Sequence, residues 1–134
     1  MTVQRITTWL GHAWDPESFI EERAREYIGN VQFDTMIGTG VSGAVIVPTL
    51  ARLFKVEWAV VRKDNDGSHG WNTVEGRVGE SWLFVDDLIS TGTTMRRVRK
   101  AMDHDHHSEF VGAYLYDDRT FYNAAQIDRN WPMI

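Results

Sequence analysis

The segment from Trp82 to Thr94 constrains the fold more than any other part of this 134-residue chain. An apolar run ends in the acidic pair Asp86 and Asp87, and a turn rich in hydroxyl groups and glycine follows at residues 88–94. From Met95 to Met102 the apolar residues then recur at helical spacing, with basic residues between them. This order predicts a buried strand that passes through a short turn directly into a helix.

A strand-to-helix turn of this composition is suited to a phosphate and a sugar. The N–H groups of the turn and the positive end of the helix dipole attract an anion, and Gly92 lets the backbone approach a ligand closely. Asp86 and Asp87 can accept hydrogen bonds from ribose hydroxyls or bind Mg2+ through water. The alternative is a helix N-cap after a surface acidic pair, but capping needs only one such residue. Further donors are the hydroxyls of Ser90, Thr91, Thr93 and Thr94.

The same segment resembles the motif with which type I phosphoribosyltransferases bind phosphoribosyl pyrophosphate (PRPP). In that motif a short hydrophobic strand is followed by two acidic residues and a Thr-Gly-x-Thr turn, which match Leu83 to Val85, the acidic pair and residues 91–94 here. The resemblance implies that Asp86 and Asp87 are catalytic, facing the ribose hydroxyls and Mg2+. It also implies a 5-phosphate site made of Ser90, Thr91, Gly92, Thr93 and Thr94.

A second glycine-rich stretch, residues 38–43, has the spacing of another anion-binding loop. It is not a P-loop, because no Gly-Lys-Ser/Thr follows, and it lacks the glycine spacing of a dinucleotide-binding fingerprint. Taken alone, it could equally be a tight connection between a strand and a helix. In the family, a loop at this place binds the pyrophosphate. The resemblance therefore implies a pyrophosphate site made of Thr39, Gly40, Val41, Ser42 and Gly43.

The basic pair Arg62 and Lys63 follows the next expected strand, 57–61. In several branches of the family such a pair helps to bind the pyrophosphate and a flexible loop then closes over the reacting centre, so the resemblance implies a catalytic role for both residues. The alternative is a solvated rim at the end of a strand. The expected lid spans residues 64–78, with Asp64, Asp66 and His69 as its candidate residues.

A histidine-rich stretch, Asp103 to His107, could suggest a metal site. Metal-binding imidazoles must converge on one point, and neighbouring side chains in a loop diverge easily. We favour a polar turn after a helix, where histidine suits the negative end of the helix dipole.

The expected elements alternate between strand and helix. This alternation predicts an α/β domain with a mostly parallel sheet, helices on both faces and a ligand at the C-terminal ends of the strands. We expect a single domain over residues 1–134, with a core at 33–116; the resemblance implies a small hood built from residues 1–14 and 117–134. The stretch 62–80 predicts a long loop or a frayed hairpin. The expected strands are 33–37, 57–61, 82–86 and 110–116, and the expected helices are 16–28, 43–54 and 93–102.

Composition limits the classes of partner. The net charge of −5 disfavours nonspecific binding to nucleic acid, which needs a basic surface. The chain has no cysteine, which excludes disulfides and thiolate metal sites. Residues 1–10 resemble neither a signal peptide nor a membrane span, so we expect a cytoplasmic protein without a membrane partner. The resemblance also suggests a homodimer.

The resemblance implies an enzyme of nucleotide salvage, a Mg2+-dependent phosphoribosyltransferase. It would transfer ribose 5-phosphate from PRPP to a nucleobase or a related nitrogen nucleophile and release pyrophosphate. Relatives that act on hypoxanthine and guanine have an aspartate where this chain has Ser90, and a lysine downstream, whereas no lysine follows Lys100. A 6-oxopurine acceptor is therefore disfavoured. Two alternatives stay open: a non-catalytic regulator of the same fold that binds PRPP or a nucleotide, and an unrelated α/β phosphate-ester binder or hydrolase.

Overall fold

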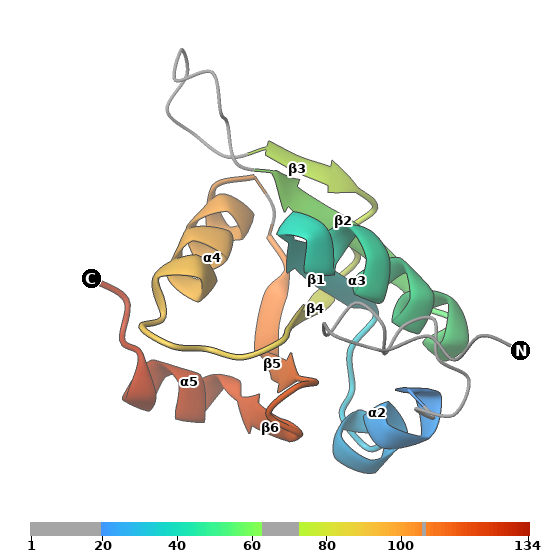
Figure 1. The fold of residues 1–134 in the computed structure, drawn as a ribbon. Helices are drawn as coiled ribbons and strands as arrows, with labels where there is room; N and C mark the ends of the chain where they lie inside the picture. The colour runs from blue at the N-terminus through green and yellow to red at the C-terminus, as the bar shows by residue number, and fades with distance from the viewer. Residues whose placement is uncertain (1–19, 63–72, 106) are drawn as a thin grey trace, which may run out of the picture.

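The computed structural model describes residues 20–62, 73–105 and 107–134. A six-stranded sheet lies between two layers of helices, with the strand order β3-β2-β1-β4-β5-β6 (Figure 1). The strands are β1 (Thr35–Thr39), β2 (Glu57–Arg62), β3 (Thr73–Gly76), β4 (Ser81–Asp86), β5 (Glu109–Leu115) and β6 (Thr120–Asn123).

The four central strands, β2, β1, β4 and β5, run parallel, and each edge strand is antiparallel to its neighbour. Ile37 of β1 lies opposite Phe84 of β4. Two residues further along, β1 ends at Thr39 and β4 ends at Asp86. The register therefore brings the acidic pair and the glycine-rich stretch to the same edge of the sheet, as the alternation of elements predicted.

Helices cover both faces of the sheet, which confirms the expected fold class. Successive side chains of a strand point to opposite faces. Accordingly, Leu83 and Val85 pack with α2 and α3, whereas Trp82 and Phe84 pack with α4 and α5. The helices are α2 (Ile20–Ile28), α3 (Gly40–Phe54), α4 (Thr93–Asp105) and α5 (Ala124–Asn130). In the part of the chain that the structure describes, no helix is both long and apolar enough to cross a membrane.

Two stretches that the sequence left ambiguous have regular structure. Within 62–80, the hairpin was the better interpretation, because β3 pairs with β2 and places Thr73 opposite Arg62. Residues 120–130 extend the sheet beyond the expected core with β6 and α5. The start of α5 is a capping box in which Asn123 and Gln126 exchange hydrogen bonds. Residues 1–14 lie outside the described part, and a hood made of them and of 117–134 stays a prediction.

Candidate active site

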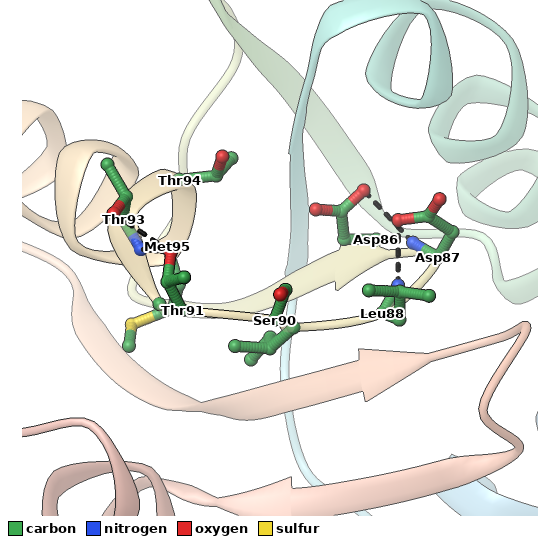
Figure 2. A pocket seen from close by; sticks show the side chains of 10 residues that line it. Asp86, Asp87, Leu88, Ser90, Thr91, Thr93, Thr94 and Met95 are labelled. Carbon is green, nitrogen blue, oxygen red and sulfur yellow. Dashed lines mark hydrogen bonds between the residues drawn. The ribbon is translucent and has the colours of Figure 1, made fainter.

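The connection from β4 to α4 surrounds a cavity of about 200 Å3, which residues 86–95 line. The carboxyl groups of Asp86 and Asp87 lie at one end of the connection, and the threonines Thr91, Thr93 and Thr94 lie at the other (Figure 2). The predicted ribose and 5-phosphate residues therefore line one cavity. Its volume is below that of a typical drug-sized ligand site, so it suits a part of a ligand, such as a sugar with its phosphate.

Short local hydrogen bonds fix both carboxylates. The N–H of Asp87 donates to Oδ1 of Asp86 at 2.9 Å, and the N–H of Leu88 donates to Oδ1 of Asp87 at 2.7 Å (Figure 2). A carboxylate has about four acceptor positions. A backbone donor therefore orients each group, and the oxygens of a carboxylate can also accept from hydroxyl groups or water.

The turn of the site depends on the backbone conformation of Gly92. Its φ is +89°, and an added Cβ would lie 2.7 Å from Cδ1 of Trp131. A residue with a side chain would thus be strained and would also collide with an indole ring. Beside it, the hydroxyls of Thr91 and Thr93 are 3.0 Å apart and share a hydrogen bond.

The glycine-rich stretch does not form the predicted loop. β1 continues to Thr39, and α3 begins at Gly40, whose φ of +65° makes the turn. The other two glycines allow α3 to pack on β1, because a Cβ on Gly43 would lie 2.6 Å from the carbonyl carbon of Gly38. The backbones of β1 and α3 thus approach too closely to leave room for a loop. The stretch is a direct connection from strand to helix.

The hydroxyl of Thr39 is used within the fold. The side chain is only 8% exposed; its hydroxyl donates to the carbonyl oxygen of Val61 at 2.6 Å and accepts a hydrogen bond from Arg97 at 2.9 Å. It makes no capping bond to α3. The first N–H groups of a helix have no acceptor within the helix, so the start of α3 remains suited to an anion.

Arg97 is a site residue that the sequence did not identify. It lies on α4 and joins this helix to Thr39 at the end of β1. Burial lowers the pKa of its guanidinium, and the negative charge of Asp86 opposes that shift. Arg97 is thus a cation between the two phosphate-binding candidates. The sequence shows several arginines on this helix, and only the packing distinguishes this one.

Only part of the predicted pyrophosphate and lid region falls in the described residues. Nε of Arg62 lies 3.3 Å from Oε1 of Glu75, and both side chains are more than half exposed. Ion pairs of this kind contribute little to stability, so this pair leaves Arg62 able to exchange Glu75 for an anionic ligand. Lys63, Asp64, Asp66 and His69 lie outside the described residues.

The donor atoms of the site fit a magnesium ion shared with a phosphorylated ligand. Mg2+ commonly binds to one or two carboxylates, several waters and substrate phosphates. Asp86 and Asp87 provide that number of carboxylates. No group of three or more His, Cys, Asp or Glu residues converges anywhere in the described ranges, which include His104 and His107 but not His106.

Comparisons with known proteins support the family resemblance. No protein-family model matches the chain. Over 34 residues it is 56% identical to the xanthine-guanine phosphoribosyltransferase of Nitratidesulfovibrio vulgaris (strain DP4), a match that covers 25% of this chain and 20% of that protein.

Solved phosphoribosyltransferase structures share the fold. Orotate phosphoribosyltransferase from Aeropyrum pernix aligns with a TM-score of 0.66 at 19% identity, over 81% of this chain and 63% of that one. The Saccharomyces cerevisiae adenine phosphoribosyltransferase, in complex with an imino-altritol bisphosphate and adenine, aligns with a TM-score of 0.58 at 22% identity, over 75% and 68%. The chain therefore has the fold of the type I phosphoribosyltransferases and over a quarter of its length also shares sequence with one of them, which confirms the resemblance that its PRPP-binding motif indicated.

Proposed function

We propose that this protein is a phosphoribosyltransferase that transfers ribose 5-phosphate from PRPP to a nucleobase or a related nitrogen nucleophile. The observation that supports this most is the β4–α4 connection, in which an acidic pair and a threonine-rich turn line one cavity. The fold similarity disfavours the alternative of an unrelated α/β phosphate-ester binder or hydrolase.

In this proposal the two ends of the cavity bind different parts of PRPP. The turn 90–94 binds the 5-phosphate through N–H groups and hydroxyls, and Asp86 and Asp87 accept hydrogen bonds from the ribose hydroxyls. The start of α3 binds the pyrophosphate together with Arg62 and Lys63. β1 and β4 are neighbouring strands, whose backbones lie about 4.8 Å apart, so both anion-binding ends are within reach of one ligand.

The proposed reaction is a displacement at C1 of the ribose. The bond from C1 to the pyrophosphate oxygen breaks, a bond from C1 to the acceptor nitrogen forms, and the proton of the acceptor passes to water or to the departing pyrophosphate. The protein would position the reactants and stabilise the charge of the departing pyrophosphate, while the expected lid, 64–78, excludes water. Bound Mg2+, held by the ligand and by Asp86 and Asp87, would neutralise part of the phosphate charge.

The sequence and the comparison point to different acceptors. Ser90 is exposed in the turn and cannot act as a carboxylate base, which disfavours a 6-oxopurine. The local similarity to a xanthine-guanine phosphoribosyltransferase favours one. We give more weight to Ser90 in predicting the acceptor, since a catalytic base has to contact the nucleobase directly. Acceptors of both classes are therefore included in the assay.

A regulator of the same fold that binds PRPP or a nucleotide without catalysis is the second candidate. The observation that favours it is again Ser90, because the turn keeps its phosphate-binding features while it lacks the carboxylate. A cytoplasmic location and a homodimer remain part of the proposal for either function.

Calorimetric titration with PRPP and Mg2+, followed by an assay for pyrophosphate release, tests these functions. We expect saturable binding, and release of pyrophosphate with one acceptor among adenine, guanine, xanthine, hypoxanthine, orotate and uracil. Tight binding without release on any acceptor would indicate the regulator. A chain that does not bind PRPP at all has neither function.

A further inference from the structure

The segment that follows α5 passes close to the start of α4 (Figure 1): Trp131 lies beside Gly92 of the proposed 5-phosphate turn, and Pro132 is hydrogen-bonded to Arg96 of α4. The indole of Trp131 occupies the space where a side chain on Gly92 would be. It also contacts the ring of Tyr122 on β6, edge to face, with the ring centroids 5.6 Å apart. The backbone N–H of Trp131 donates to the carbonyl oxygen of Ile127 at 2.8 Å and so ties this residue to the end of α5. The backbone of Trp131 is therefore held by α5, while its indole packs on Tyr122 of β6 and lies beside the glycine of the turn.

Arg96 joins the same two segments through its guanidinium. Nε donates to the carbonyl oxygen of Pro132 at 2.8 Å, and Nη1 donates to the carbonyl oxygen of Thr91 at 3.2 Å. Its backbone N–H also donates to the carbonyl oxygen of Gly92 at 2.9 Å. One residue on α4 thus bonds to the turn twice and to the segment after α5 once.

These bonds determine the direction of a donor in the turn. The carbonyl of Thr91 and the N–H of Gly92 belong to one planar trans peptide, so they point in opposite directions. Because Arg96 holds the carbonyl, the N–H of Gly92 is directed away from the guanidinium. Thr91 and Gly92 both line the cavity. Fixing this peptide in advance removes an ordering cost from the binding of an anion there.

We propose that Arg96 and Trp131 form a clamp that fixes the peptide between Thr91 and Gly92, and so determines the affinity of the turn for the phosphate of a ribose 5-phosphate group. The proposal rests on the proposed function. Both are positioning residues, since Arg96 acts through backbone carbonyls and Trp131 through the space beside Gly92. Residues 131–132 are then part of the phosphate site, through the indole of Trp131 beside Gly92 and the carbonyl oxygen of Pro132 that accepts from Arg96.

Ribose 5-phosphate is the probe for this clamp, because it tests the turn without the pyrophosphate site. We expect Arg96→Gln to weaken its binding about tenfold in calorimetry, since it removes two hydrogen bonds from a charged donor. Arg96→Lys should weaken it similarly, because an ammonium keeps the charge but not the two-armed geometry. If Arg96 acted only by attracting the phosphate, the lysine variant would bind like the wild type, which would overturn the clamp.

Arg99→Gln is the matched control for Arg96. Arg99 also lies on α4 and also contacts the α5 region, through a 2.6 Å ion pair with Asp128, but this ion pair and the position of Arg99 over the ring of Phe110 involve no residue of the turn. This variant should bind ribose 5-phosphate within twofold of the wild type. Trp131→Ala should weaken binding about tenfold, whereas Trp58→Ala, at a part-exposed tryptophan on β2, should not.

A spectroscopic measurement separates positioning from a general loss of structure. In protein labelled with 15N-glycine, ribose 5-phosphate should shift the amide resonance of Gly92 in the wild type. In Arg96→Gln this resonance should be displaced before the ligand is added, while the resonances of Gly38 and Gly43 stay in place. An Arg96→Gln variant that binds and shifts like the wild type would overturn the clamp alone. A wild-type protein that binds neither ribose 5-phosphate nor PRPP would overturn the proposed function, and the clamp with it.

Discussion

The guanidinium of Arg97 donates a 2.9 Å hydrogen bond to the hydroxyl of Thr39 and so joins α4 to the end of β1. The proposed ribose and 5-phosphate site leads into α4, and the proposed pyrophosphate site begins at Thr39. The two halves of the site are thus connected by a part-buried contact. That contact also occupies the hydroxyl that could otherwise cap α3.

This bond predicts the effect of Arg97→Met. The change removes a positive charge near the start of α3 and frees the Thr39 hydroxyl to compete for the N–H groups of that helix. We expect the affinity for inorganic pyrophosphate with Mg2+ to fall about tenfold or more, which corresponds to the loss of one or two charged hydrogen bonds. Titration calorimetry measures it. Lys100→Met, at an exposed position of the same helix, is the control, and equal affinities of the two variants would contradict the prediction.

The acidic pair is expected to bind ligand and not to stabilise the fold. In Asp86→Asn/Asp87→Asn, each side chain keeps an oxygen that can accept the next N–H, but both negative charges are lost. We expect PRPP binding with Mg2+ to weaken at least about tenfold, with a cooperative thermal transition retained. The double variant Asp103→Asn/Asp118→Asn changes the charge equally at exposed positions and should bind normally. Loss of the cooperative transition in the first variant would show that the acids are structural.

The glycines at the start of α3 should respond differently to substitution. Gly43→Ala would place a methyl group 2.6 Å from the backbone of Gly38, so α3 would have to move, at a cost of about 3 kcal/mol of unfolding free energy. Gly40 has open space around it but a φ of +65°, a conformation that asparagine tolerates better than alanine. Gly40→Asn should therefore cost less than Gly40→Ala. Urea unfolding measures all three, and a stable Gly43→Ala protein would contradict the close packing.

The fall in the free energy of unfolding at acidic pH should depend on Asp34. Burial alone would raise the pKa of this carboxyl, but donors from Glu80, Thr35 and Ser81 together lower it. Its stabilising contribution is therefore complete above its pKa in the unfolded chain, about 3.9, and is lost as the pH falls through the lower folded value. Asp34→Asn should cost about 1–3 kcal/mol at pH 7 and should flatten the decline below pH 4. Unfolding curves at pH 3 to 7 test this, and an unchanged fall at acidic pH would contradict it.

Local sequence determined the elements on either side of the cavity and the composition of the cavity itself. The strand that ends at Asp86, the turn with Gly92 and the helix from Thr93 are consecutive in the chain, so their order and their chemistry are visible in the sequence. The alternation of strands and helices likewise determined the parallel sheet and its two helical layers. The capping box of Asn123 was a further local signal that could have located α5.

Only the tertiary structure decided how distant residues complete the site. The bond from Arg97 to Thr39 spans 58 positions, and the bond from Arg96 to Pro132 spans 36. Likewise, Gly43 packs on Gly38 because α3 lies directly against β1. Periodicity and motifs describe a residue's neighbours along the chain. Contacts between elements depend on strand order and on the register and packing of whole helices, which no local pattern specifies.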